Sequence, residues 1–182
     1  MKRKYYYYII AVVVLIIAIL FTHRWYSGCF IKVNVQEKEM GPLLVVCEYF
    51  YGLQKETRLM RDKLSYSLES DGIKDIKEFY AIHKEKDYKG DPIRKIGFII
   101  GKDDHKNFDR VKDTYNTIVL EKGKYLVVHF PLKTKLSFYV GFRKSRNAFL
   151  EMCKEKNNEL TAFYSYINEE KKEAVYFVKI TE

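Results

Sequence analysis

The sequence lacks several residues and motifs that define common protein classes. Only three Pro and nine Gly occur among 182 residues, which excludes a collagen-like chain or a Pro-rich linker protein. No CxxC, HExxH or GxSxG motif and no Gly-rich phosphate loop is present, so no signature of a metal site, a serine hydrolase or a nucleotide loop exists. We therefore predict no catalytic residue, no metal and no cofactor.

Acidic residues are missing from residues 1–30, which carry four Lys and Arg. This segment accounts for nearly half of the formal net charge of +9. In the remainder, Lys and Glu alternate through most charged stretches, as on a solvated surface. Because neither a basic stripe nor a nucleic-acid-reading motif is evident, we expect no nucleic-acid partner.

A long uncharged run follows the basic N-terminus. Residues 5–22 contain no charge, and about 18 helical residues at about 1.5 Å each span about 27 Å, close to a bilayer's hydrocarbon core. Tyrosines at 5–8 and then Trp25 and Tyr26 place aromatic rings at both ends, where headgroups favour them. A cleaved signal peptide would have a shorter apolar region and a small-residue cleavage site. We therefore predict that residues 1–30 form a retained single-pass transmembrane anchor with its flanks.

The distribution of Lys and Arg predicts the orientation of this helix. The three basic residues at 2–4, with the terminal amine, outweigh Arg24 and the more distant Lys32 on the other flank. Since the more basic flank stays in the cytoplasm, we expect a cytoplasmic N-terminus and the rest of the chain on the opposite side of the membrane.

The three cysteines do not suggest a disulfide framework. Cys47 lies in an apolar strand pattern and Cys153 on a predicted helix, so both are interpreted as small buried hydrophobic residues. Cys29 follows small residues, as in a lipoprotein signal, but Tyr26 replaces the usual leucine and charges intervene. A lipidated Cys29 stays open as the less favoured alternative.

Residues 31–182 contain an internal repeat. Three matches occur in the same order at nearly constant spacing: 39–46 with 121–128, 79–82 with 163–166, and 96–100 with 175–180. Three ordered matches predict two copies of one strand-helix-strand-strand unit, about 31–101 and 114–182. Residues 101–113 between them form a polar loop in this interpretation.

Helical spacing of apolar residues places one helix near 55–70 and another at about 133–156. The bend between the first two strands falls at Gly41-Pro42, because Pro cannot donate to a strand ladder. The predicted fold class is α+β: duplicated strand-helix-strand-strand units form one antiparallel sheet with two helices on one face, preceded by a single transmembrane helix. A groove is expected where the two units meet.

This plan resembles the GyrI-like small-molecule-binding domain, also found as the effector-binding half of multidrug-responsive transcription activators. The resemblance covers about 31–182. Its motifs are Tyr51-Gly52, Pro92-Ile93-Arg94-Lys95-Ile96-Gly97, Gly123-Lys124-Tyr125, Phe130-Pro131 and Tyr166-Ile167-Asn168-Glu169. With its N-terminal helix the chain is most similar to membrane-anchored GyrI-like proteins, whose animal representative is an ER-phagy receptor. That receptor carries its partner motif on a tail beyond the domain, whereas this sequence stops at Glu182, so we do not expect the ER-phagy role.

The resemblance implies binding of lipophilic, often cationic, aromatic compounds in the groove between the units. Two family positions differ here. The Glu that faces the groove, two residues before Tyr166, is Tyr164, and the Trp of the second helix is Tyr139. Without that carboxylate, a cation would depend on ring faces, worth about 0.5–2 kcal/mol per contact. Hydrolysis, which some relatives perform, would lack its general base.

Seven residues are candidates for ligand binding: Tyr49, Tyr51, Tyr80, Arg94, Tyr139, Tyr164 and Tyr166. For any single tyrosine, cross-strand or core packing is favoured over ligand binding, because aromatic residues favour such packing in sheets. Three functions stay open. The first is non-catalytic binding of a lipophilic or amphipathic small molecule by a protein anchored in the lipid bilayer. The second is a membrane-anchored protein-interaction module with a closed groove and an unknown protein partner, and the third is a small-molecule hydrolase.

Overall fold

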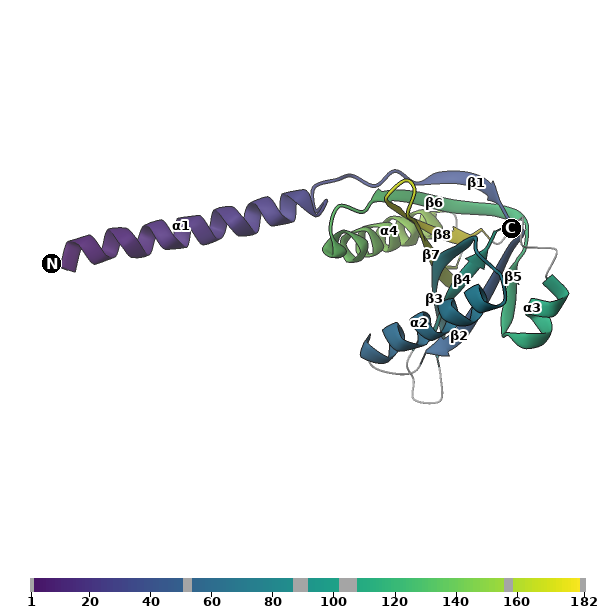
Figure 1. The fold of residues 1–182 in the computed structure, drawn as a ribbon. Coiled ribbons are helices and arrows are strands. Elements are labelled where there is room, and N and C mark those ends of the chain that lie inside the picture. The colour runs from purple at the N-terminus through teal and green to yellow at the C-terminus, as the bar shows by residue number, and fades with distance from the viewer. Residues whose placement is uncertain (1, 51–53, 87–91, 102–107, 156–158, 181–182) are drawn as a thin grey trace.

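The structure is a computed structural model that describes residues 2–50, 54–86, 92–101, 108–155 and 159–180. Its elements are α1 (Lys2–Tyr26), β1 (Gln36–Met40), β2 (Leu43–Phe50), α2 (Gln54–Ser70), β3 (Ile76–Lys86), β4 (Pro92–Ile100), α3 (Phe108–Thr114), β5 (Thr117–Leu120), β6 (Gly123–Pro131), α4 (Lys135–Glu155), β7 (Ala162–Asn168) and β8 (Glu173–Lys179). α1 projects away from a domain built from the other elements (Figure 1).

The eight strands form one sheet in the order β1-β6-β8-β7-β3-β4-β2-β5. All neighbouring strands are antiparallel. The edge strand β1 pairs with β6 and the opposite edge strand β5 pairs with β2, while β3 and β7 pair in the middle. The predicted α+β class with a single antiparallel sheet is confirmed.

Alternation along the strands divides their side chains between two faces of the sheet. On one face, Leu44 and Val46 pack with Leu64 and Leu68 of α2, and a matching cluster from β6 and β8 packs with α4 around Phe149. We call this the helix face. Because neighbouring residues of a strand point in opposite directions, the residues between these lie on the other face.

The second face, here called the inner face, is covered by the sheet itself. One cluster joins side chains from β1 at one edge to β5 at the other, through Phe79 of β3 and Phe177 of β8. Both of these phenylalanines are 0% exposed, and none of the described residues of the cluster lies on a helix. The sheet therefore curls, so that its two halves bury each other's inner-face residues.

Gly41 allows the chain to pass from β1, at one edge of the curled sheet, to β2, which lies next to the opposite edge strand. Its φ is +90°, and an ideal Cβ there would lie 2.8 Å from the carbonyl oxygen of Glu121. A side chain would be strained by the backbone conformation and would collide with the β5–β6 connection. The predicted bend at Gly41-Pro42 is confirmed by the break between β1 and β2.

The helix predictions are correct to within two residues for α2 and α4, but α3 was not expected. Part of the predicted polar loop forms this short helix because Val111 is buried among apolar residues beneath α2. Tyr115, just after α3, donates a hydrogen bond from its hydroxyl to Oδ2 of Asp71 at 2.7 Å. These contacts hold α3 on the domain.

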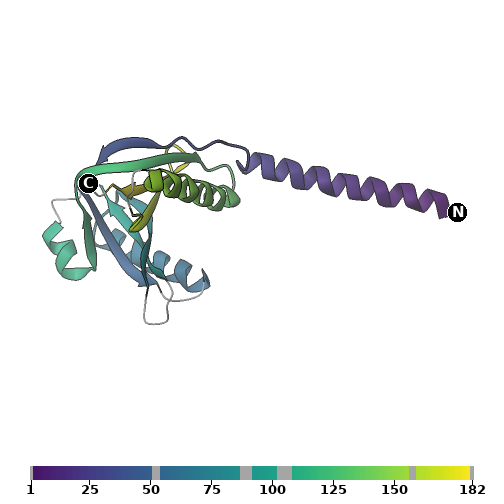
Figure 2. The same cartoon turned by 180° about the vertical axis from the view of Figure 1, so that it is seen from behind.

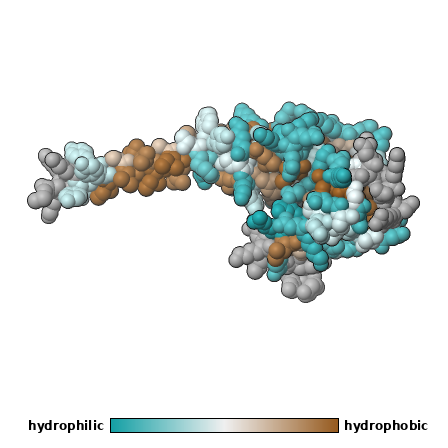
Figure 3. Space-filling model, viewed as in Figure 1, coloured by the Kyte–Doolittle hydropathy of each residue, from teal (hydrophilic) through white to brown (hydrophobic). Residues whose placement is uncertain are grey.

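α1 is exposed along its length. Residues Tyr5–Tyr26 form a helix long and apolar enough to cross a membrane, on length and composition alone. None of that span is buried against the domain, which distinguishes it from the core helix of a soluble protein. A signal sequence at the N-terminus has the same length and apolar composition. Figure 3 shows its apolar side chains as a brown rod between paler residues and the mainly hydrophilic domain.

Candidate inter-helix site

The middle of the sheet lies between α2 and α4. α4 packs over β6, β8 and Phe163 of β7, and α2 packs over β4, which leaves the central strand β3 between the two helices. On the helix face, Glu78, Tyr80 and Ile82 of β3 are only partly buried, whereas Phe79 and Ala81 on the inner face are fully buried. Central strands are normally the most deeply covered, so this strip is an accessible surface between the helices.

Four residues, Arg61, Glu78, Tyr80 and Phe138, connect α2 to α4 across this strip, and we call them the inter-helix site. Nη1 of Arg61 lies 2.9 Å from Oε1 of Glu78, and the hydroxyl of Tyr80 donates to Oε2 of Glu78 at 3.2 Å. The Tyr80 ring contacts the ring of Phe138 with centroids 5.6 Å apart. A carboxylate, a guanidinium and two aromatic rings therefore meet on the helix face.

The positions of Arg61 and Phe138 are fixed by further contacts. Arg61 also donates to Oδ1 of Asp62, from Nη2 at 2.7 Å and from Nε at 3.0 Å. Phe138 packs against Tyr176, whose hydroxyl donates to the carbonyl oxygen of Phe138 at 2.6 Å. The first turns of α4 are thus tied to β8.

Burial determines the protonation of the site. Burial, and next the negative charge of Glu78, raise the pKa of Tyr80 to about 12, against the opposing effect of Arg61. The hydrogen bond to Asp62 raises the pKa of Arg61 further above its ordinary value. At neutral pH the site holds a neutral phenol and a permanent cation.

The structure places three of the predicted ligand residues at or near the helix face. Tyr80 belongs to the inter-helix site. Tyr139 lies on the outer side of α4, 53% exposed, with its ring 5.9 Å from that of Phe138. Arg94 is exposed and pairs with Ile82, and strand alternation gives it the same face as Phe98, which packs on α2.

The other described candidates lie on the inner face. Tyr164 stacks between Phe79 and Phe177, with centroid distances of 6.0 and 5.4 Å, and Tyr166 contacts the edge of Phe177. Tyr49 shares the face of Val45 and carries Nζ of Lys95 at 5.0 Å from its ring centroid. Tyr51 lies outside the described residues. Strand alternation therefore divides the described candidates between the two faces of the sheet, and their role in ligand binding stays a prediction.

Arg61, Glu78 and Phe138 were not identified from the sequence. The resemblance directed attention to the acid missing at Tyr164, yet that position faces inward. The available signal was the spacing of Glu78 and Tyr80, two residues apart on one strand and therefore on one face. Arg61 gave no signal, since it lies in a largely polar helix.

Within the described ranges, no group of three or more His, Cys, Asp or Glu residues is arranged to hold a metal ion.

Comparison with known proteins supports the fold. No protein-family model matches the chain, and no curated protein matches it either. Among solved structures it is similar to SAV2435 bound to tetraphenylphosphonium, with TM-score 0.53 and 10% identity over 81% of this chain and 94% of that one. The C-terminal domain of EcmrR gives TM-score 0.55 and 8% identity over 82% and 98%. The chain therefore has the fold of these domains, which is the GyrI-like fold that the resemblance predicts.

Proposed function

We propose that this chain is a membrane-anchored binding module that holds a lipophilic cation at the inter-helix site without transforming it. The carrying observation is the half-buried carboxylate of Glu78, which pairs with Arg61 and accepts from Tyr80, whose ring in turn contacts Phe138. The likeness to SAV2435, whose structure contains the lipophilic cation tetraphenylphosphonium, supports this choice of ligand class.

In the proposed binding mechanism, Glu78 releases Arg61 and pairs with the cationic ligand instead. Arg61 donates to Asp62 as well as Glu78, so it keeps a counter-charge if Glu78 turns to a ligand. A delocalised cation over the faces of Tyr80 and Phe138 would gain about 0.5–2 kcal/mol per ring. The carboxylate that the family places at another position is thus replaced in function by Glu78.

The proposal is for binding and not for catalysis. Glu78 shares its carboxylate with a guanidinium and a phenol, and Tyr80 keeps its proton up to a pH of about 12. The phenol of Tyr80 is therefore not prepared as a general base near neutral pH, where efficient catalysts have matched pKa values, and the Glu78 carboxylate is already paired with two donors. Hydrolysis of a panel of small esters at a rate abolished by Glu78→Gln would refute this part.

Two further expectations belong to the proposal. α1 is a retained single-pass helix with a cytoplasmic N-terminus, supported by its length, its apolar surface and its basic first residues. The domain arose by duplication, supported by a sheet order in which the first strand of each half pairs with the second strand of the other. Intact mass from membranes and a reporter fused after Glu182 test retention and orientation.

Binding of tetraphenylphosphonium to the full chain in detergent, followed by isothermal titration calorimetry, tests the site. Tyr80→Ala should weaken binding by about 2- to 30-fold, and Glu78→Gln should weaken it as well. Arg61→Gln should strengthen it, because the ligand no longer competes for Glu78. Tyr66→Ala, at an exposed position of α2, is the control. If all four variants bind tetraphenylphosphonium with the affinity of the parent chain, the inter-helix site is excluded.

A protein-interaction module with a closed groove is the second candidate. The filled inner face favours it, since Val45, Phe79 and Phe177 at its centre are 0% exposed. Under this alternative tetraphenylphosphonium does not bind the full chain at all, and crosslinking in membranes captures a partner through the domain surface.

A further inference from the structure

The connection between α1 and the domain is a packed contact rather than a loose linker. Ser27 is fully buried and accepts a hydrogen bond from Oγ1 of Thr134 at 3.2 Å. Gly28, at φ +88°, lies so close to Phe130 that an ideal Cβ would be 2.9 Å from its Cζ. α1 therefore ends directly against the segment that leads into α4.

The residues after Gly28 continue along the domain without a spacer. Nζ of Lys144 donates to the carbonyl oxygen of Ile31 at 2.7 Å, which ties this segment to α4. Ile31, Val33 and Val35 pack against the apolar cluster beneath α4. In both views the end of α4 that follows β6 points towards α1 (Figures 1 and 2). A bilayer crossed by α1 would therefore meet this end of α4.

The depth of the contact follows from the length of α1. A span of about 20 residues crosses the hydrocarbon core, which leaves Trp25 and Tyr26 at headgroup level. Nζ of Lys133 lies 5.6 Å from the ring centroid of Tyr26. Because Lys133 is part of the domain, the domain itself reaches the headgroup level.

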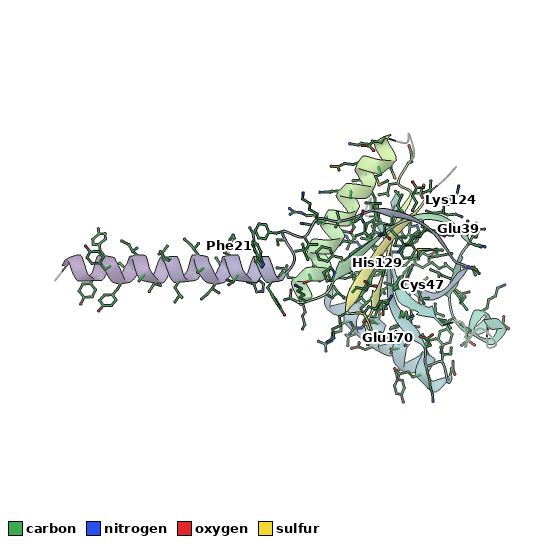
Figure 4. All side chains as sticks on the ribbon, turned by 90° about the horizontal axis from the view of Figure 1, so that it is seen from above. Phe21, Glu39, Cys47, Lys124, His129 and Glu170 are labelled. Carbon is green, nitrogen blue, oxygen red and sulfur yellow. The ribbon has the colours of Figure 1, made fainter. Side chains whose placement is uncertain are left out.

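Exposed aromatic and apolar side chains gather at this junction. Phe21, Trp25 and Phe30 form a ring cluster with centroids 5.3–6.2 Å apart, and all three rings are exposed. Phe21 lies near the domain end of α1 (Figure 4). Leu136 and Tyr139 are exposed on the first turns of α4. Rings with polar edges beside aliphatic groups suit the interface between acyl chains and headgroups.

The two segments that form the junction are basic. Residues 21–36 contain Arg24 and Lys32, residues 132–150 contain five Lys and Arg, and neither range contains an Asp or Glu. Glu173 of β8 pairs with Pro131 beside them. Two of these cations, Lys133 and Lys135, lie at the start of α4, where the helix dipole disfavours positive charge. An external anion would compensate for this unfavourable placement.

We propose that the start of α4 is a second membrane contact, in which Lys133, Lys135, Leu136 and Tyr139 bind anionic phospholipids beside α1. The inference rests on the membrane anchorage proposed above. Basic residues bind the phosphates electrostatically, while the leucine and tyrosine enter the interface. The contact holds the domain in one orientation on the bilayer.

Trp25 is the sole tryptophan of the chain, so fluorescence quenching by lipids brominated near the headgroup tests the proposal directly. The full chain is placed in nanodiscs of brominated phosphatidylcholine, with or without phosphatidylglycerol. Three proteins are compared: the parent, Trp25→Phe with Tyr139→Trp, and Trp25→Phe with Tyr66→Trp as the control on exposed α2. Circular dichroism verifies that each variant is folded.

Quenching is expected for the parent in both lipids, for the Tyr139→Trp variant chiefly with phosphatidylglycerol, and not for the Tyr66→Trp variant. Adding Lys133→Glu and Lys135→Glu should abolish quenching of the Tyr139→Trp variant. If the parent is quenched and the Tyr139→Trp variant is not, the second contact is refuted while the anchor stands. Equal quenching of the Tyr139→Trp variant with and without phosphatidylglycerol refutes the anionic preference. An unquenched parent refutes the anchor and the contact together.

Discussion

The closed inner face leads to a sharp prediction for Phe177→Ala. Phe177 is fully buried at the middle of the inner-face cluster. Its ring contacts those of Tyr125, Tyr164 and Tyr166 at centroid distances of 5.8, 5.4 and 6.0 Å. Truncation leaves a cavity bounded by both halves of the sheet, which cannot collapse without changing the curl.

The expected cost follows from comparable truncations. Replacing a buried phenylalanine by alanine lowers the free energy of unfolding by about 3–5 kcal/mol, from lost transfer energy and the residual cavity. For a domain of this size each kcal/mol corresponds to about 2–4 °C, so the melting temperature should fall by about 6–20 °C. If the inner face were instead an open ligand groove, the ring would already contact water and the loss would be smaller.

Thermal unfolding of the full chain in detergent, followed by circular dichroism, measures the effect. Tyr49→Ala provides the matched control, because Tyr49 shares the inner face but is 48% exposed. The control should cost at most about 1 kcal/mol. A Phe177→Ala variant that melts within 2–3 °C of its parent, roughly 1 kcal/mol at this size, would refute the closed core and reopen the inner face as the ligand site.

Three further predictions concern α4, Tyr80 and the cysteines. Gly141→Ala should destabilise the protein in thermal unfolding, because its Cβ would lie 2.8 Å from Phe130. Such overpacking costs about 1–3 kcal/mol, which exceeds the helix propensity gained. Asn147→Ala on the same helix is the control. Tyr80 keeps its proton to about pH 12 in the folded chain, but tyrosine in an unfolded chain loses it near pH 10. The folded state thus binds more protons in that window, so stability falls as pH rises through it, and Tyr80→Phe should remove part of this fall in alkaline denaturation. Burial raises the pKa of the Cys47 thiol, so mass spectrometry should find Cys29 alkylated well before Cys47; equal rates would contradict this burial.

The sequence was sufficient to predict elements whose pattern is long and regular. Apolar spacing located α2 and α4, and the uncharged run located α1, because each signal extends over many residues. It was harder to predict on which face of the sheet each side chain of the central strands lies. The repeat alignment equates Phe79 with Phe163, yet Phe79 lies on the inner face and Phe163 beneath α4. A register error of one residue exchanges the two faces of a strand, and offsets alone cannot detect it.

The candidate site was partly missed because its residues are far apart in the sequence. Its members come from α2, β3 and α4, so only the folded chain brings Arg61 to Glu78 and Phe138 to Tyr80. Tyr80 was identified because aromatic residues are conspicuous, whereas Glu78 is one of many acids in alternating charged stretches. A single charged residue acquires meaning from the side chains it meets, and the sequence does not contain that information.

α4 links the two proposals physically. Phe138 faces the inter-helix site, while Leu136 and Tyr139, its near neighbours, face outward at the junction with α1. Since one helical turn separates these groups, the ligand site lies close to the headgroups if α1 crosses the bilayer. Lipophilic cations partition into anionic interfaces, so the local ligand concentration there exceeds that in solution. A site of modest intrinsic affinity, built on ring faces and one shared carboxylate, would then be sufficient for binding in the membrane.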